Sequence, residues 1–274
     1  MNDYEEKEYV AIQKWQNKEP SVAAKAVGVV LQPLSWAITK IVPPKAIEGC
    51  LVAFDKIAEF LTDTEDVLRN AAVNNIEELQ TKDLQLSDNL AKKVHNWALA
   101  TAGVEGGATG SAGIFGMIVD IPALITMSLR VIHKIGVCYG FEVRTEQDHN
   151  FVFGILAAAS SNTFKEKTTA VVLLKRINVL VAQNTWKKLT EMAATHKHGL
   201  AALVMSIKQL AKQLGINITK RKAAQAIPII GAGVGAAINV AFLNDVSWAA
   251  RRMYQQRWLL LNKKIDDTDS RVNS

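Results

Sequence analysis

The chain has very few cysteines and no leader-like start. Only Cys50 and Cys138 occur among its 274 residues, which is too few for a disulfide framework and fits a reducing compartment. The first ten residues, MNDYEEKEYV, are acidic and polar, so they lack the basic and apolar regions of a secretory signal peptide. We therefore expect a cytoplasmic protein.

Acidic residues are scarce in the second half of the chain. Residues 1–150 have a net charge of −6, whereas residues 151–274 have a net charge of +12. Such a basic half suits anionic lipid, nucleic acid or the acidic half of the same fold. It has neither interleaved aromatic residues nor a nucleic-acid-binding motif, so we expect no nucleic-acid partner.

Strand-like alternation is also missing, while apolar residues make up 49% of the chain and recur at helical spacing. The sequence predicts an all-α fold, with a single multi-helix domain over residues 1–264 and a disordered polar tail over 265–274. The expected helices span residues 3–18, 21–39, 46–72, 121–139, 145–160, 163–214 and 220–262, and another begins at Ser87 as its N-cap.

Three of these helices have apolar faces that predict core contacts. The predicted core faces are Tyr9, Ile12 and Trp15 in the first, a stripe of Leu51, Phe54, Ile57, Phe60 and Leu61 in the third, and Leu90, Val94, Trp97 and Ala98 after Ser87.

The segment EGGATGSAGIFGMIVDIP, residues 105–122, is rich in glycine but does not fit a nucleotide site. No lysine follows its glycines and a helical pattern precedes it, which argues against a Walker loop and a dinucleotide fingerprint. Small residues four apart instead favour close helix packing. Residues 223–244, which have no charge, share this character. We predict that both segments are helical hairpins at the centre of the fold.

These two segments could also meet a bilayer. Residues 223–244 are long enough to span one, but Glu105 and Asp120 would each cost about 2.5–3.5 kcal/mol at its centre. We therefore expect a buried pair of segments or a hairpin that dips into the interface. The candidate binding residues here are the segments' polar and motif positions, namely Glu105, Gly110, Gly113, Gly116, Asp120, Arg130 and Asn239.

Structural roles compete with functional ones at these positions. Asp120 is expected to cap a helix whose first turn holds Pro122, and Gly140 to end that helix. A buried Glu105 would need a cationic partner. The candidate partners are Arg130, His133 and Lys134.

Metal-binding and nucleophile motifs are weak. Glu146 and His149 have the spacing of a di-iron helix, but no second such pair occurs, and Glu191, His196 and His198 have no recognised ligand spacing. Cys138 lies in an apolar helix, which favours a core position, and the chain has no G-x-S-x-G elbow. We expect no metal, no cofactor and no catalytic residue of these classes.

The C-terminal stretch VSWAARRMYQQRWLLLNKK combines aromatic and basic residues, and two interpretations are open. It could lie on an anionic membrane, or be a core helix whose arginines face water or pair with the acidic half. The membrane-surface candidates are Trp248, Arg251, Arg252, Arg257 and Trp258.

The glycine segment and its continuation to Glu142 resemble the signature of the EcsC family, and IPIIGAGVGAAINVAFLNDV resembles that family's C-terminal segment. The family is named after a bacterial operon that also encodes an ABC transporter, so the resemblance implies a membrane or secretion setting and no particular reaction. It marks Glu105, Gly110, Gly113, Gly116, Asp120, Pro122 and Gly140 as motif positions.

Together these patterns favour a membrane-associated accessory protein at the inner face of the membrane. Its expected partner is an anionic membrane surface or lipid, with a membrane protein or other protein as a further candidate. Two alternatives stay open. One is a hydrolase-like enzyme that uses Glu105 and Asp120 as a buried carboxylate pair, and the other is a soluble module for a protein partner.

Overall fold

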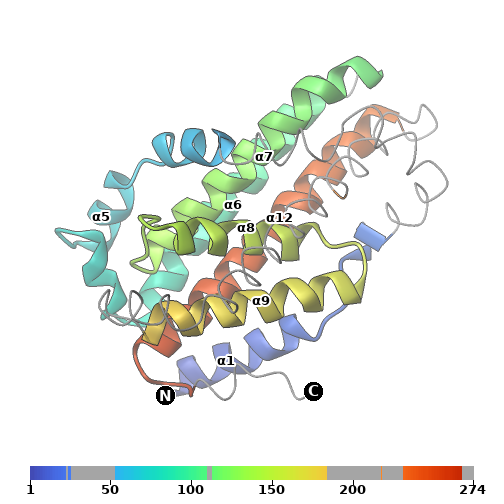
Figure 1. The fold of residues 1–274 in the computed structure, drawn as a ribbon. Helices are drawn as coiled ribbons and strands as arrows, with labels where there is room; N and C mark the ends of the chain where they lie inside the picture. Colours follow the sequence, from blue (N-terminus) through green and yellow to red (C-terminus); the bar gives the residue numbers. More distant parts are fainter. Residues whose placement is uncertain (23, 26–52, 110–112, 184–216, 218–230, 267–274) are drawn as a thin grey trace.

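The computed structural model describes residues 1–22, 24–25, 53–109, 113–183, 217 and 231–266. Within these ranges every regular element is helical and no strand occurs, which confirms the all-α prediction (Figure 1). Side chains are not described at 103–122, 179–183, 231–236 and 238. Several predictions fall wholly or partly outside the described residues: the helix at 21–39, the start of the helix at 46–72 with Leu51, the stretch 184–214 with Glu191, His196 and His198, the start of the segment 223–244, and the tail from 267 onward.

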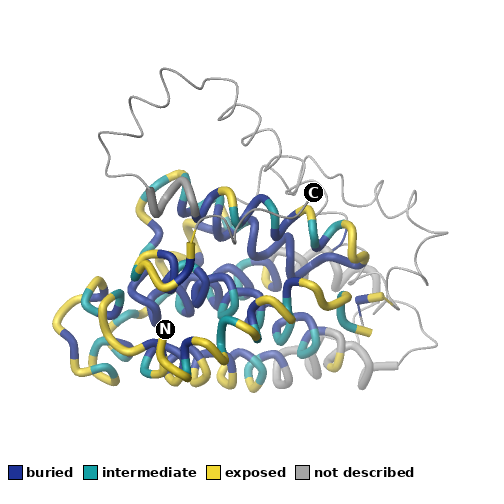
Figure 2. The backbone as a smooth tube through the Cα atoms, turned by 90° about the horizontal axis from the view of Figure 1, so that it is seen from below, coloured by how far each residue is buried: buried dark blue, intermediate teal, exposed yellow. Residues whose placement is uncertain are grey.

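The last helix, α12 (Gly231–Leu261), is the centre of the bundle. It contacts α6 (Leu84–Thr109), α7 (Gly113–Cys138), α8 (Glu146–Ser160), α1 (Asp3–Gln16) and α9 (Phe164–Gln183). Its buried residues include Phe242, Val246, Met253 and Tyr254. In Figure 2 the buried backbone gathers in the middle of the described part of the molecule and the exposed backbone lies at its edges.

The first helix follows its local sequence signals. Asn2 and Glu5 form a reciprocal capping box at the start of α1. Ile12 is buried in the core, and Tyr9 and Trp15 pack against it, which confirms the face predicted for this helix.

The described parts of the two glycine-rich segments lie in α6, α7 and α12, which all contact one another. Residues 110–112 lie outside the described part of the chain, so the role of Gly110 and the hairpin geometry stay predictions. Helix α7 already begins at Gly113, so Asp120 is inside the helix and the expected N-cap there is wrong. The apolar run on both sides of Asp120 continues the helical pattern through Pro122.

The start of α6 also differs from the prediction. Asp83, rather than Ser87, caps this helix, because its Oδ1 accepts a hydrogen bond of 2.8 Å from the Gln85 backbone N–H. Ser87 is buried inside the helix. Trp97, expected in the core, is 38% exposed.

The expected long helix over residues 46–72 is interrupted. Residues 53–60 are helical, the chain turns at 61–64, and α5 (Glu65–Ala71) and the 3-10 helix η2 (Ile76–Gln80) follow. Ile57, Phe60 and Leu61 are 48%, 90% and 44% exposed, so the prediction of a buried stripe is wrong for these three residues. We call them the 57–61 patch. Asp55 and Ala58 face inward instead.

The C-terminal ends of α7 and α12 have the same type of turn. At Gly140 (φ +87°), the Gly140 and Phe141 N–H groups donate to the carbonyls of Val137 and Gly136, which confirms the glycine expected after α7. Lys263 (φ +53°) occupies the matching position after α12. Ile265, placed in the polar tail by its sequence, is buried.

We expect Gly140→Ala to lower the free energy of unfolding by about 2 kcal/mol, because the left-handed backbone disfavours a side chain. The added Cβ would also lie 2.6 Å from the Gln80 backbone nitrogen. Lys263→Gly is the matched control, and should raise stability by up to about 1 kcal/mol. Urea unfolding of both variants measures these changes, and equal stability of Gly140→Ala and the unmodified chain would contradict the assignment.

Candidate functional site

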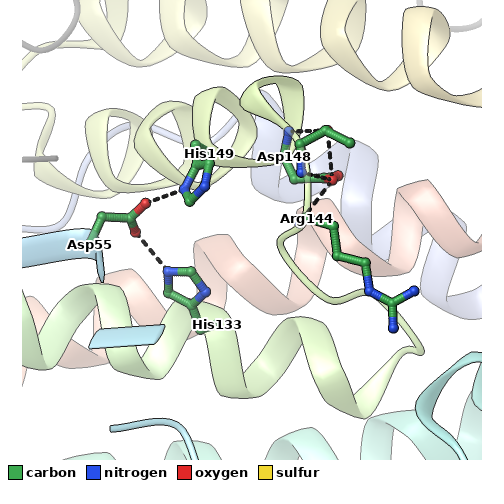
Figure 3. A network of polar contacts seen from close by, with 6 residues as sticks. Asp55, His133, Arg144, Asp148 and His149 are labelled. Atoms are coloured by element: carbon green, nitrogen blue, oxygen red, sulfur yellow. Dashed lines mark hydrogen bonds and ion pairs between the residues drawn. The ribbon is translucent and has the colours of Figure 1, made fainter. Parts of the chain in front are cut away.

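A buried carboxylate joins the 53–60 segment to two helices of the core (Figure 3). Asp55 is 1% exposed, and its Oδ1 lies 2.7 Å from His133 Nε2 on α7. Its Oδ2 lies 2.5 Å from His149 Nδ1 on α8. Both carboxylate oxygens are therefore paired with imidazole nitrogens, and we call these three residues the Asp55 clamp.

The clamp favours the charged forms of Asp55 and His149. Burial alone would raise the pKa of Asp55, but the hydrogen bonds from His133 and His149 outweigh it and lower this pKa. The hydrogen bond to Asp55 raises the pKa of His149, with support from Glu59 and Asp148 and opposition from burial. His149 is thus held as an imidazolium beside a carboxylate over a wider pH range than a free histidine.

The start of α8 provides the neighbouring charges. Asp148 accepts hydrogen bonds from the Thr145 hydroxyl and from the backbone N–H groups of Thr145 and Arg144, which closes a capping box (Figure 3). Arg257 of α12 donates to the other Asp148 oxygen at 2.8 Å. Its guanidinium also lies over the Phe141 ring. Arg257, a membrane-surface candidate by sequence, therefore pairs inside the bundle.

The other membrane-surface candidates of α12 are also turned toward the core. Arg252 donates to Glu8 Oε2 of α1 at 2.5 Å. Trp258 is 3% exposed and its indole N–H donates to the Leu79 carbonyl, so this side chain does not lie at the surface. Arg251 and Trp248 are half-buried and stack on each other. The interpretation as a core helix whose arginines pair with the acidic half describes Arg252 and Arg257 of α12, whereas the buried Nε of Arg251 has no hydrogen-bond partner.

A second buried carboxylate connects four helices. Asp88 of α6 accepts hydrogen bonds from Tyr4 of α1 at 2.7 Å, from Gln255 of α12 at 2.6 Å and from Tyr139, which follows α7. Burial raises the pKa of Asp88 although these donors and Arg251 act in the opposite direction. Asp88 is buried and both of its oxygens accept hydrogen bonds from protein side chains, which fits a role in holding the helices together.

The motif positions are only partly brought together. Glu105 lies in α6, and Gly113, Gly116 and Asp120 lie in α7, where only the backbone is described, so the proposed carboxylate pair stays a prediction. Two of the three expected partners of Glu105 are paired elsewhere. His133 contacts Asp55, and Lys134 forms an ion pair of 2.9 Å with Asp66. Asn239 is buried in α12.

Arg130, the third expected partner, lies at the surface of the α6–α7 pair. Its guanidinium carbon is 5.1 Å from the centre of the Trp97 ring. Its Nε is buried and has no hydrogen-bond partner. Arg130 therefore remains a candidate binding residue.

Sequence reasoning misses the Asp55 clamp. The spacing of His149 suggests a partner only in Glu146, and Asp55 lies beside an apolar stripe with no motif of its own. The one local signal was the charge of Asp55 between apolar neighbours, because its partners lie 78 and 94 residues away. Within the described ranges, no group of three or more acidic, histidine or cysteine side chains has a geometry that suits a metal ion.

These features define an all-helical protein with a buried, charge-paired central helix. The chain belongs to the EcsC protein family, whose model matches residues 6–259, and this confirms the resemblance found in the glycine segment. It is similar to "Uncharacterized protein YdbA" of Bacillus subtilis (strain 168), with 22% identity over 218 residues that cover 77% of this chain and 74% of that protein. "Protein EcsC" of the same organism is 26% identical over 181 residues, covering 65% and 67%. No solved structure matches the chain.

We expect Asp55→Asn to lower the free energy of unfolding by about 3 kcal/mol, because it removes the charge that two imidazoles share in a buried position. The contribution of His149 should be full below pH 6.5 and decline as the pH rises through its raised pKa. The contribution of Asp55 should be full above pH 3.8 and decline as the pH falls through its lowered pKa.

Denaturant unfolding of the unmodified chain and His149→Gln across this pH range measures the effect. The stability difference between the two should be largest between pH 3.8 and 6.5. A difference that does not change with pH would show that the Asp55 clamp has no ionic component.

Proposed function

We propose that the protein is a membrane-associated accessory protein of the cytoplasm, and that it binds the inner face of the membrane through the 57–61 patch. The observation that carries this proposal is the outward orientation of Ile57, Phe60 and Leu61, of which Phe60 is 90% exposed. These residues have i, i+3, i+4 spacing, so they share one helical face.

This orientation is costly in water. Moving a side chain of this size out of water is worth about 1.5–3 kcal/mol, yet the segment buries the charged Asp55 and leaves Phe60 outside. The Asp55 clamp holds the segment in this orientation. Exposed apolar faces next to polar residues are typical of membrane or partner contacts.

A lipid surface is favoured over a protein partner because the family resemblance implies a membrane or secretion setting. Lys56 and Glu59 are both exposed beside the patch, so its rim is polar and carries charges of both signs. Among the described helices, none is both long and apolar enough to cross a bilayer, so the proposed mode is attachment by a surface patch.

We expect Phe60→Asp to weaken binding to phospholipid vesicles by about tenfold or more, because it removes the exposed aromatic ring that would enter the bilayer and adds a charge at the interface. Vesicle flotation measures binding. Phe164→Asp is the matched control, because Phe164 is also exposed (39%) but lies on α9, and it should bind vesicles like the unmodified chain.

Fractionation of expressing cells gives an independent test. The protein should be found in the membrane pellet and be released by a carbonate wash. Retention through carbonate would mean insertion of a longer segment, and a wholly soluble protein that ignores vesicles would contradict the proposal and favour the protein-partner module.

A further inference from the structure

Four side chains form a basic and aromatic cluster on the surface of the α6–α7 pair. Lys93 and Trp97 lie one turn apart on α6, and Arg130 and Lys134 lie one turn apart on α7. Arg130 stacks on Trp97, and α5 bridges the other two residues, since Asp66 pairs with Lys134 and Asn70 accepts a hydrogen bond from Lys93. We call these four residues the Arg130 cluster.

Arg130 differs from the arginines that have a carboxylate nearby. Arg144, Arg252 and Arg257 each form an ion pair with a carboxylate. Arg251 also stacks on an indole and has a buried Nε without a hydrogen-bond partner, but its charge acts on Asp88 and lowers the pKa of that carboxyl. In the part of the chain that the structure describes, no carboxylate pairs with Arg130, and its buried Nε has no hydrogen-bond partner. A half-buried guanidinium usually has an anionic or carbonyl acceptor.

The cluster keeps an excess of positive charge. Asp66 compensates Lys134, but the partner of Lys93 is the neutral amide of Asn70. Arg130 and Lys93 therefore leave two positive charges beside an exposed indole. A guanidinium stacked on an aromatic ring has a fixed plane, and its donor edge matches the oxygens of a phosphate.

The segment that carries the 57–61 patch packs on α7 beside the cluster. Asp55 contacts His133 and Asp66 contacts Lys134, so the 53–60 segment and α5 pack on the same turn of α7. Only residues 61–64 separate these two segments in the chain. A small apolar patch alone gives weak membrane binding, and stable attachment needs a second signal.

We infer that the Arg130 cluster binds a phosphate group, and that on the membrane this is the headgroup phosphate of an anionic lipid. The inference rests on the proposed function for the source of the phosphate, because free phosphate has the same chemistry. Arg130 supplies the planar donors, Lys93 adds charge, and Trp97 occupies the level of the headgroups, where indoles are favoured.

Vesicles of phosphatidylcholine with about one-fifth phosphatidylglycerol, compared with pure phosphatidylcholine, test the inference. Arg130→Gln should bind the anionic vesicles about fivefold more weakly and bind the neutral ones unchanged, because the choline of phosphatidylcholine already compensates its phosphate. Arg176→Gln, which removes an exposed charge from α9, should bind both like the unmodified chain. Arg130→Lys should lie between. Should Arg130→Gln fail to fold by near-ultraviolet circular dichroism, Lys93→Gln, at an exposed position, takes its place.

The outcomes separate the two proposals. If Phe60→Asp abolishes binding while Arg130→Gln and Lys93→Gln have no effect, the headgroup inference is overturned and the proposed function stands. Equal losses for Arg130→Gln and Arg176→Gln also overturn it, because net charge then explains the binding. If no vesicle binds but inorganic phosphate raises the melting temperature of the unmodified chain and not of Arg130→Gln, the phosphate site stands and the proposed function fails.

Discussion

The arginines of the central helix constrain the whole bundle. A charge on a helix that is covered on several sides is costly unless it meets a carboxylate or another acceptor. Arg252 finds Glu8 of α1 and Arg257 finds Asp148 of α8, while Gln255 reaches Asp88 of α6. The opposite net charges of the two halves of the chain, −6 and +12, fit this arrangement, since Glu8, Asp88 and Asp148 all come from residues 1–150. The basic C-terminal stretch is therefore largely engaged within the fold.

In the 53–60 segment, too, a buried charge has found partners. Here the consequence is that apolar side chains of the same helix are exposed. Two imidazoles can satisfy both oxygens of Asp55, so the carboxylate is buried and the phenyl ring of Phe60 faces outward. The electrostatic requirement of one residue thus determines which face of a helix meets the solvent. This is why the Asp55 clamp bears on the proposed function.

Arg130 is informative because it departs from this rule. Its neighbours His133 and Lys134 on α7 have carboxylate partners, whereas Arg130 has an aromatic ring beneath it and no described carboxylate. The cluster and the 57–61 patch are joined through α5 and one turn of α7. Together they place apolar, aromatic and basic groups in neighbouring positions, which is the combination that interfacial proteins use.

The sequence by itself determined the features that depend on neighbours within about four residues. Helical periodicity predicted the all-α class and the core face of α1, and the Gly140 position predicted the end of α7, because caps and repeats are local. Tertiary structure alone decided which face of residues 53–60 is buried, because His133 and His149 are 78 and 94 residues from Asp55. It also decided that Trp258 is internal and Trp97 external. Amphipathicity predicts that a helix has two faces, but the partners available in the fold decide which face is covered.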